Sequence, residues 1–208
     1  MSIEIWVTFV LAAMVLLVIP GPTIILVISQ AIAHGRRAAL PLTLGVTLGD
    51  FTAMTLSLLG LGAIMASSAA LFSVLKWIGA IYLIYLGIKL WRSNPGQHEL
   101  RLSATRTSQQ SLFRSAFIVT ALNPKSIAFF VAFLPQFVST ESEAFPQFLM
   151  LGTTFLSLAA LNAALYALFA GRLRDTMQNQ KVQRWFNRFG GSALIGAGVV
   201  TATLQRSS

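Results

Sequence analysis

Long stretches without charge constrain this chain most strongly. No charged residue occurs between Glu4 and His34, so 5–33 is one uncharged run. About 20 mostly apolar residues suffice for a helix to cross ~30 Å of hydrocarbon. Backbone groups find no partners in lipid, so we expect helices. Five more apolar stretches follow this first one, and they lie at about 38–65, 69 or 76 to 91, 115–138, 145–171 and 189–204.

Composition agrees with an integral membrane protein. Only 10% of the 208 residues are charged and the mean hydropathy is +0.73, whereas soluble domains carry roughly a quarter charged residues. At this length we expect one transmembrane domain over residues 1–208. The absence of cysteine excludes disulfides and thiolate metal sites.

The positive charges fall in alternate loops. Twelve of the fifteen Lys and Arg residues follow the first, third and fifth stretches, whereas Glu141 and Glu143 follow the fourth. The positive-inside rule then predicts that these three loops are cytoplasmic and that both termini lie outside. It also explains the net charge of +9 without nucleic acid as a partner. Glu4 and the lack of a preceding Lys or Arg disfavour a signal peptide.

The first stretch leaves two topologies open. Pro20-Gly21-Pro22 interrupts it, so it either crosses the membrane as a broken helix or turns back as a re-entrant segment that leaves Met1 inside. The charges do not separate these alternatives. We favour the full crossing because the stretch is long enough despite its break.

The two halves of the chain resemble each other. Pro20-Gly21-Pro22 matches Asn123-Pro124-Lys125 in order along the halves, and four positions of the third stretch match the sixth at a constant offset of 111. We expect an all-α architecture of six transmembrane helices in two inverted repeats of three, with helices one and four broken. The predicted parts are repeat one at about 1–91, a cytoplasmic connector at 92–114 and repeat two at about 115–208. The matched positions are Gly79, Leu83, Ile84 and Gly87 with Gly190, Leu194, Ile195 and Gly198.

Helix breaks in a membrane free backbone groups that must face protein, water or a ligand. The amides that begin a half-helix at Pro22 and Thr23 carry a partial positive charge suited to a carboxylate. A simple structural kink is the competing interpretation. Two breaks at matching positions favour a functional role.

Two ionisable side chains fall near the middle of the predicted bilayer. These are Asp50 and Lys125, and such residues are costly within lipid and are by default candidates for function. We expect both to face one solvent-reachable chamber with the two breaks. The alternative is an ion pair that only fixes helix packing. Attraction to Lys125 favours an ionised Asp50 and desolvation favours a protonated one, a balance that a proton-coupled carrier could use.

Intramembrane amides are further candidates. Asn123 ranks first because it adjoins a break, and Asn162 and Gln30 are as suited to bonding a neighbouring helix as to a substrate. Glycines such as Gly45, Gly49 and Gly87 indicate close helix packing. The candidate transport residues are Pro20, Gly21, Pro22, Thr23, Asp50, Asn123, Pro124, Lys125 and Asn162.

The chain resembles the LysE/RhtB family of amino-acid exporters, most closely its homoserine/threonine exporter branch. The resemblance covers nearly the whole chain, and it implies proton-driven efflux from the bacterial cytoplasm across the inner membrane, by a protein that is a possible homo-oligomer. The family's signature positions correspond to Pro20, Gly21, Pro22, Asn123, Pro124 and Lys125. The motifs that carry the resemblance are Pro20-Gly21-Pro22, His34-Gly35-Arg36-Arg37, Leu75-Lys76-Trp77-Ile78-Gly79-Ala80, Tyr82-Leu83-Ile84, Leu86-Gly87-Ile88, Asn123-Pro124-Lys125-Ser126-Ile127 and Pro135-Gln136-Phe137.

We therefore predict an amino-acid exporter that works by proton antiport and alternating access, without cofactor or metal. One acid opposite one base favours a neutral substrate, such as homoserine, threonine or a branched-chain amino acid. Basic amino acids and other small metabolites are alternatives, and a channel or a scaffold subunit is a further one. Enzymatic activity is not expected, because His34 and His98 lie in or beside loops and no paired-carboxylate or nucleophile motif is present.

Overall fold

The computed structural model describes residues 1–67, 69–93, 108–139 and 142–203. Within these ranges all regular structure is helical. The elements are α1 (Ile3–Val18), α2 (Pro22–His34), η1 (Gly35–Ala38), α3 (Ala39–Ser67), α4 (Ala69–Arg92), α5 (Gln109–Ala121), α6 (Pro124–Ala128), η2 (Phe129–Phe133), η3 (Leu134–Phe137), α7 (Ala144–Gln178) and α8 (Gln180–Thr203).

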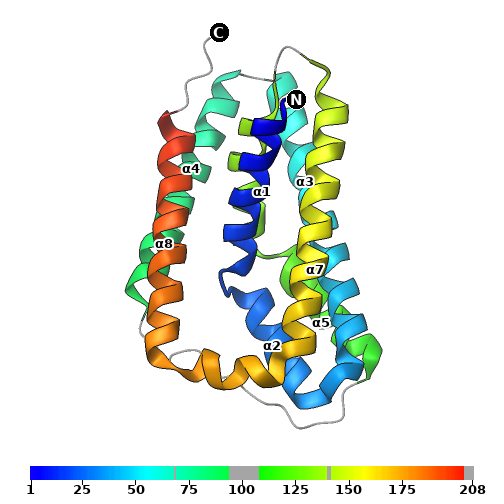
Figure 1. The fold of residues 1–208 in the computed structure, drawn as a ribbon. Coiled ribbons are helices and arrows are strands. Elements are labelled where there is room, and N and C mark those ends of the chain that lie inside the picture. The colour runs from blue at the N-terminus through cyan, green and yellow to red at the C-terminus, as the bar shows by residue number, and fades with distance from the viewer. Residues whose placement is uncertain (68, 94–107, 140–141, 204–208) are drawn as a thin grey trace.

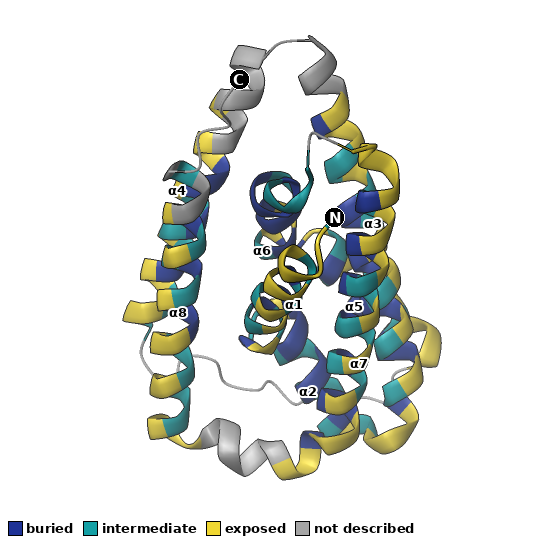
Figure 2. Ribbon diagram, turned by 45° about the horizontal axis from the view of Figure 1, so that its top comes forward, coloured by how far each residue is buried: buried dark blue, intermediate teal, exposed yellow. Residues whose placement is uncertain are grey.

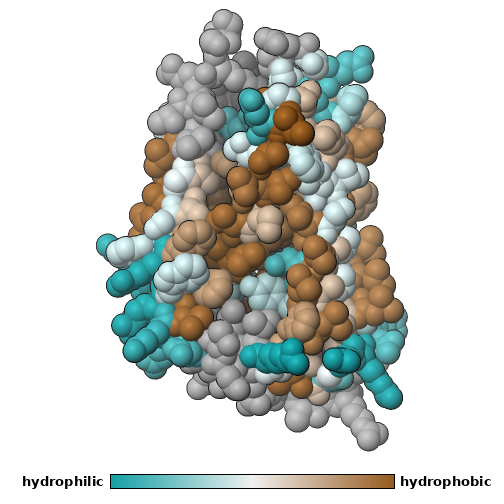
Figure 3. Space-filling model, viewed as in Figure 1, coloured by the Kyte–Doolittle hydropathy of each residue, from teal (hydrophilic) through white to brown (hydrophobic). Residues whose placement is uncertain are grey.

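Three helical stretches in the described part of the chain are long and apolar enough to cross a membrane, namely Pro22–Gly62, Gln109–Phe137 and Ala144–Arg172. Helix α1 is apolar but shorter. Large apolar side chains such as Leu44, Leu56 and Leu161 are exposed, and apolar side chains gather over the middle of the face in Figure 3. An exterior of this kind suits a lipid environment better than water.

The break in the first apolar stretch lies where the sequence predicts it. Helix α1 ends at Val18, Ile19 is extended and α2 begins at Pro22. Proline suits the first position of a helix, since its missing N–H has no intrahelical partner there. After the break the chain continues along the long axis of the bundle and does not turn back (Figure 1). This course is compatible with the broken crossing, and which of the two topologies holds in the membrane stays a prediction.

The fourth stretch is also broken. Helix α5 ends at Ala121 and α6 begins at Pro124, with Asn123 as its N-cap. A π-helical turn (η2) and a 3₁₀ turn (η3) continue it to Phe137. A change of helix type of this kind is frequent at functional sites in helices.

Two boundaries of the apolar stretches differ from the helix ends. The connector predicted at 92–114 is shorter, because Gln109 already begins α5; residues 94–107 of that prediction lie outside the described residues. The Ser108 hydroxyl accepts a hydrogen bond from the Ser111 amide at 3.2 Å, which starts α5 within a polar sequence. The apolar stretch from about 189 is the later part of α8, which begins at Gln180; its basic first turns are helical although they are too polar for lipid.

The helices form three groups (Figures 1 and 2). Helices α4 and α8 pack side by side as an antiparallel pair. Helix α3 contacts α5 and α7 on the opposite side, and α7 also contacts α1 and α2. The α1–α2 column and the α6–η3 segment lie between these groups, with their buried residues toward the interior (Figure 2). Both helix breaks are therefore located inside the bundle.

Glycines in α4 and α8 make the same contacts in exchanged order. A Cβ added at Gly87 would lie 2.6 Å from the Gly191 carbonyl and 2.7 Å from Ile195 Cγ1. A Cβ added at Gly198 would lie 2.7 Å from the Ala80 carbonyl and 2.6 Å from Ile84 Cγ1. Positions 80, 84 and 87 plus 111 give 191, 195 and 198, so each contact of Gly87 has its counterpart at Gly198. The packing role that the sequence indicates for these glycines is confirmed.

Candidate functional site

The end of α1 holds a lysine from the other half of the chain. A helix end leaves its last carbonyls without intrahelical partners. The Lys125 ammonium donates to the Leu16 carbonyl at 2.9 Å and to the Ile19 carbonyl at 3.0 Å. The negative end of the helix dipole favours a cation at this position. A Cβ at residue 21 would lie 3.3 Å from Lys125 Nζ, so Gly21 leaves room for the ammonium.

The two carbonyls between these also have side-chain donors. Asn162 Nδ2 donates to the Leu17 carbonyl at 3.1 Å, and the Tyr166 hydroxyl donates to the Val18 carbonyl at 2.9 Å. Both donors come from α7 and are four residues apart, so they lie on one helix face. We call the carbonyls of Leu16, Leu17, Val18 and Ile19 the carbonyl cluster. Each of its members accepts a hydrogen bond from the second half of the chain.

The second break is tied directly to the first. Asn123 Oδ1 accepts from the Lys125 amide at 3.1 Å and thereby caps α6, while Asn123 Nδ2 donates to Thr23 Oγ1 at 3.2 Å. Thr120 Oγ1 also donates to Thr23 Oγ1, at 3.3 Å. All three side chains are buried. The start of α2 therefore lies against the end of α5 and the start of α6.

Asp50 reaches the same place from α3. Its neighbour Gly49 packs tightly on α5, since a Cβ there would lie 2.7 Å from Thr120 Cβ. The Asp50 carboxylate lies close to the Ser126 side chain and is attracted by Lys125. It is 3% exposed, and Oδ1 has no hydrogen-bond partner among the described residues. An unpartnered buried carboxylate oxygen costs free energy, which marks it as a candidate for binding a proton or a cationic group.

The start of α2 offers a complementary charge. Gly21 is the N-cap and gives no side-chain cap to the helix, and Pro22 takes the first position. The Ile25 amide is bonded to the Gly21 carbonyl at 3.0 Å. The amides of Thr23 and Ile24 precede that bond and carry the partial positive charge of a helix N-terminus.

The structure thus brings together the residues singled out from the sequence. Pro20 to Thr23, Asn123 to Lys125 and Asp50 meet where the two breaks adjoin, and Asn162 joins them through the carbonyl cluster. Sequence reasoning missed Thr120, Ser126 and Tyr166. Tyr166 follows Asn162 by one helical turn, and that spacing is the signal that could have revealed it.

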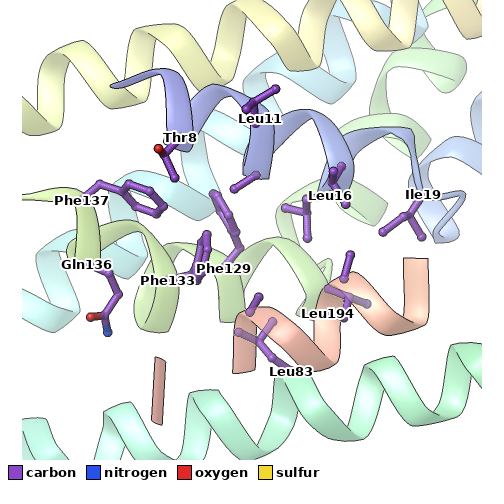
Figure 4. A pocket seen from close by; sticks show the side chains of 14 residues that line it. Thr8, Leu11, Leu16, Ile19, Leu83, Phe129, Phe133, Gln136, Phe137 and Leu194 are labelled. Carbon is purple, nitrogen blue, oxygen red and sulfur yellow. The ribbon is translucent and has the colours of Figure 1, made fainter. Parts of the chain in front are cut away.

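In this conformation the described residues around Asp50 close it off from solvent, and the solvent-reachable chamber expected from the sequence stays a prediction. Asp50 and Asn123 are each 3% exposed and Thr23 is 7% exposed, because α2, α3 and α5 pack closely around them. A cavity of about 510 Å³ lies nearby, between α1, η2–η3, α4 and α8 (Figure 4). Leu16 and Ile19 belong to its lining, but Asp50 and Lys125 do not. Its lining is almost entirely apolar, with Thr8 and Gln136 as the polar members.

The sequence of most of the chain matches a known protein family. The model of the LysE type translocator family matches residues 14–205, which include both breaks, Asp50 and Lys125. The chain belongs to the LysE type translocator family. Members of this family are transporters. The resemblance seen in the sequence motifs is confirmed.

Relatives of this LysE type translocator cover at least 95% of its length. A homoserine/homoserine lactone efflux protein of Salmonella typhimurium is 32% identical over 207 residues, which are 100% of both chains. A membrane protein of Vibrio cholerae is 35% identical and covers 99% of this chain and 100% of its own. A leucine efflux protein of Salmonella typhimurium is 27% identical over 95% of this chain and 94% of its own. No solved structure matches the chain.

Proposed function

We propose that this protein exports neutral amino acids from the bacterial cytoplasm by proton antiport with alternating access. The substrate class comprises homoserine- or threonine-like and branched-chain amino acids. One observation carries the proposal: in a translocator family member, a buried carboxylate attracted by a lysine lies where two helix breaks meet, and its Oδ1 has no hydrogen-bond partner among the described residues.

The proposed architecture is six membrane-spanning helices in two inverted repeats. Helices α3 and α5 are in contact, and so are α7 and the α1–α2 column, which are the pairs that the repeat would exchange. The exchanged contacts of Gly87 and Gly198 support a local two-fold relation between α4 and α8. An odd number of spans in each half would make the halves opposite in orientation. The basic loops would then be cytoplasmic and both termini outside.

The site contains groups for both ends of an amino acid. The unpartnered Asp50 Oδ1 suits an ammonium group, and the first-turn amides of α2 near Thr23 suit a carboxylate. The Lys125 ammonium adds a full positive charge to the partial positive charge of these amides, and a substrate carboxylate could approach both. The proposed transport residues are Pro20, Gly21, Pro22, Thr23, Asp50, Asn123, Pro124, Lys125 and Asn162.

Proton coupling follows from competition for one carboxylate. A substrate ammonium and a proton would both neutralise Asp50, and either is preferable to a bare buried charge. Binding of one would therefore release the other. If the protonated form returns the empty carrier, each cycle exchanges one substrate for a proton.

The charges at the site favour a substrate whose net charge is zero. Asp50 and Lys125 balance each other, so a zwitterion leaves the site without net charge. A basic amino acid would bring a further buried charge without a partner. The names of the homoserine and leucine efflux relatives agree with this class.

A counterflow screen tests this proposal. The purified protein is reconstituted into liposomes loaded with an unlabelled amino acid, and entry of the same labelled amino acid is measured with and without a pH gradient. We expect counterflow of homoserine, threonine or leucine, and net movement that depends on the gradient. Counterflow of lysine or arginine alone would contradict the substrate class, and flux far above carrier turnover would indicate a channel.

A further inference from the structure

A second cavity lies at the start of α8, away from the helix breaks. A cavity of about 500 Å³ opens there, lined by Trp91, Lys181, Arg184, Trp185, Arg188, Phe189 and Ser192. Its charged lining residues are all cations. Figure 3 shows hydrophilic side chains gathered at this lower end of α8. The transport proposal uses none of these residues.

The packing of α4 against α8 builds this site. A Cβ at Gly191 would lie 2.9 Å from Trp91 Cβ and 3.0 Å from the Trp91 amide nitrogen, so the glycine allows the end of α4 to approach. Asn187 Nδ2 also donates to Ser93 Oγ at 2.8 Å. As a result, the Arg188 guanidinium lies over the Trp91 ring, 5.4 Å from its centroid. This cation–π contact holds Arg188 in place and leaves its N–H groups directed to other partners.

Aromatic rings extend the site on its apolar side. The Trp185 and Phe189 rings are stacked, with centroids 5.4 Å apart and planes inclined by 2°. Trp185 is 62% exposed and Phe189 is 52% exposed, although both are large apolar groups. Tryptophan next to basic residues is typical of the boundary between lipid headgroups and acyl chains.

We propose that this cavity binds the headgroup of an anionic phospholipid. The three cations Lys181, Arg184 and Arg188 match a phosphate, for which arginine offers paired donors. The rings of Trp91, Trp185 and Phe189 contact the glycerol and upper acyl region. A soluble anion would gain nothing from the exposed rings, and a zwitterionic headgroup would place its own cation among three others.

A lipid bound in this cavity would contact both helices of the α4–α8 pair. It lies at the end of the glycine contacts between α4 and α8, so a bound headgroup bridges the end of one helix and the start of the other. Anionic lipid would then hold α4 and α8 together at this end.

The test compares two double variants of the full-length protein. Arg184→Gln with Arg188→Gln removes two cations from the cavity, and Arg36→Gln with Arg37→Gln removes two exposed arginines from η1 as a matched control. Retention of phosphatidylglycerol and phosphatidylcholine is measured by native mass spectrometry at several salt concentrations. We expect wild type and control to retain phosphatidylglycerol selectively, and the cavity variant to bind it about tenfold more weakly, with the effect reduced at high salt.

A second variant tests the role of the Trp91 ring, and competition with inorganic phosphate distinguishes a lipid headgroup from a soluble anion. Trp91→Leu retains every cation but removes the ring beneath Arg188, and it should also weaken retention. Excess inorganic phosphate should displace the lipid only by screening, to the same extent as chloride at equal ionic strength. Wild-type retention in the Arg184/Arg188 variant, equal loss in the Arg36/Arg37 control, or specific displacement by phosphate alone would each overturn the proposal.

Discussion

At the scale of single residues, Lys125 joins the two breaks. Its ammonium bonds two carbonyls of the cluster and its amide is capped by Asn123. Asn162 and Tyr166 provide one bond each to the same cluster. Lys125 therefore has a structural role in this conformation as well as its proposed role in transport, and the two roles are separable by experiment.

Lys125→Met is expected to destabilise the fold. It removes two charge-assisted hydrogen bonds and leaves two carbonyls buried without donors, which together cost about 3 kcal/mol. For a chain of this length, that lowers the thermal midpoint by about 6 to 12 °C. Tyr166→Phe removes one neutral bond and should cost about 1 kcal/mol. Equal midpoints for the two variants would show that the Lys125 bonds are not maintained in solution.

The sequence predicts which residues meet here, because ionisable and amide groups are rare within lipid-spanning stretches. It does not predict the partners. Asp50 and Lys125 were expected either to line a chamber or to pair, yet Lys125 donates to backbone carbonyls and one oxygen of Asp50 has no partner among the described residues. The carbonyls of an interrupted helix are present in every sequence, so only coordinates reveal which side chain reaches them.

At the scale of helices, the breaks and the glycine contacts position the site. Proline marks both breaks in the sequence, so they could be placed to within a residue or two. The π-helical turn at Phe129 has no such mark, since it depends on how the phenylalanines pack against Phe9 and Phe155. Hydropathy marks only the later, apolar part of α8, because the basic turns before it are too polar for lipid although they are helical.

Alanine at matched glycines tests the relation between α4 and α8. Gly87→Ala and Gly198→Ala each place a Cβ within 2.7 Å of a backbone carbonyl on the partner helix, so each should cost about 1 to 3 kcal/mol. Gly196→Ala is the control, because nothing lies within 4 Å of its Cβ. It should stabilise the helix by up to about 1 kcal/mol. Thermal midpoints that fall for only one of the two matched glycines would argue against the exchanged contacts.

At the scale of the whole molecule, charge and hydropathy predict the all-helical membrane fold well, since both follow from the cost of burying polar groups in lipid. Three helical stretches in the described ranges are clearly long and apolar enough to span. The six-span topology is still a prediction. The course of α1 and α2 through the bundle supports its first crossing (Figure 1).

Single cysteines test that topology, and the chain has no cysteine of its own to interfere. Ile3→Cys and Ser142→Cys should react with a membrane-impermeant maleimide in intact cells. Arg37→Cys and Arg184→Cys should react only after permeabilisation, because the basic segments that contain them are predicted to be cytoplasmic. If Ile3→Cys behaved like Arg37→Cys while Ser142→Cys labelled from outside, the first stretch would not cross and Met1 would be inside.

The most direct test of the central claim is efflux driven by a pH gradient in liposomes that contain Asp50→Asn. The substitution keeps the size of the side chain but removes the acid that proton and substrate would share. The Lys125 ammonium keeps its two carbonyl acceptors in this variant, and thermal unfolding checks that the variant is folded before efflux is measured. We expect gradient-driven efflux to fall at least about a hundredfold, since no group remains to exchange a proton for substrate, while Arg36→Gln with Arg37→Gln keeps the wild-type rate. Wild-type efflux by folded Asp50→Asn protein would contradict the account.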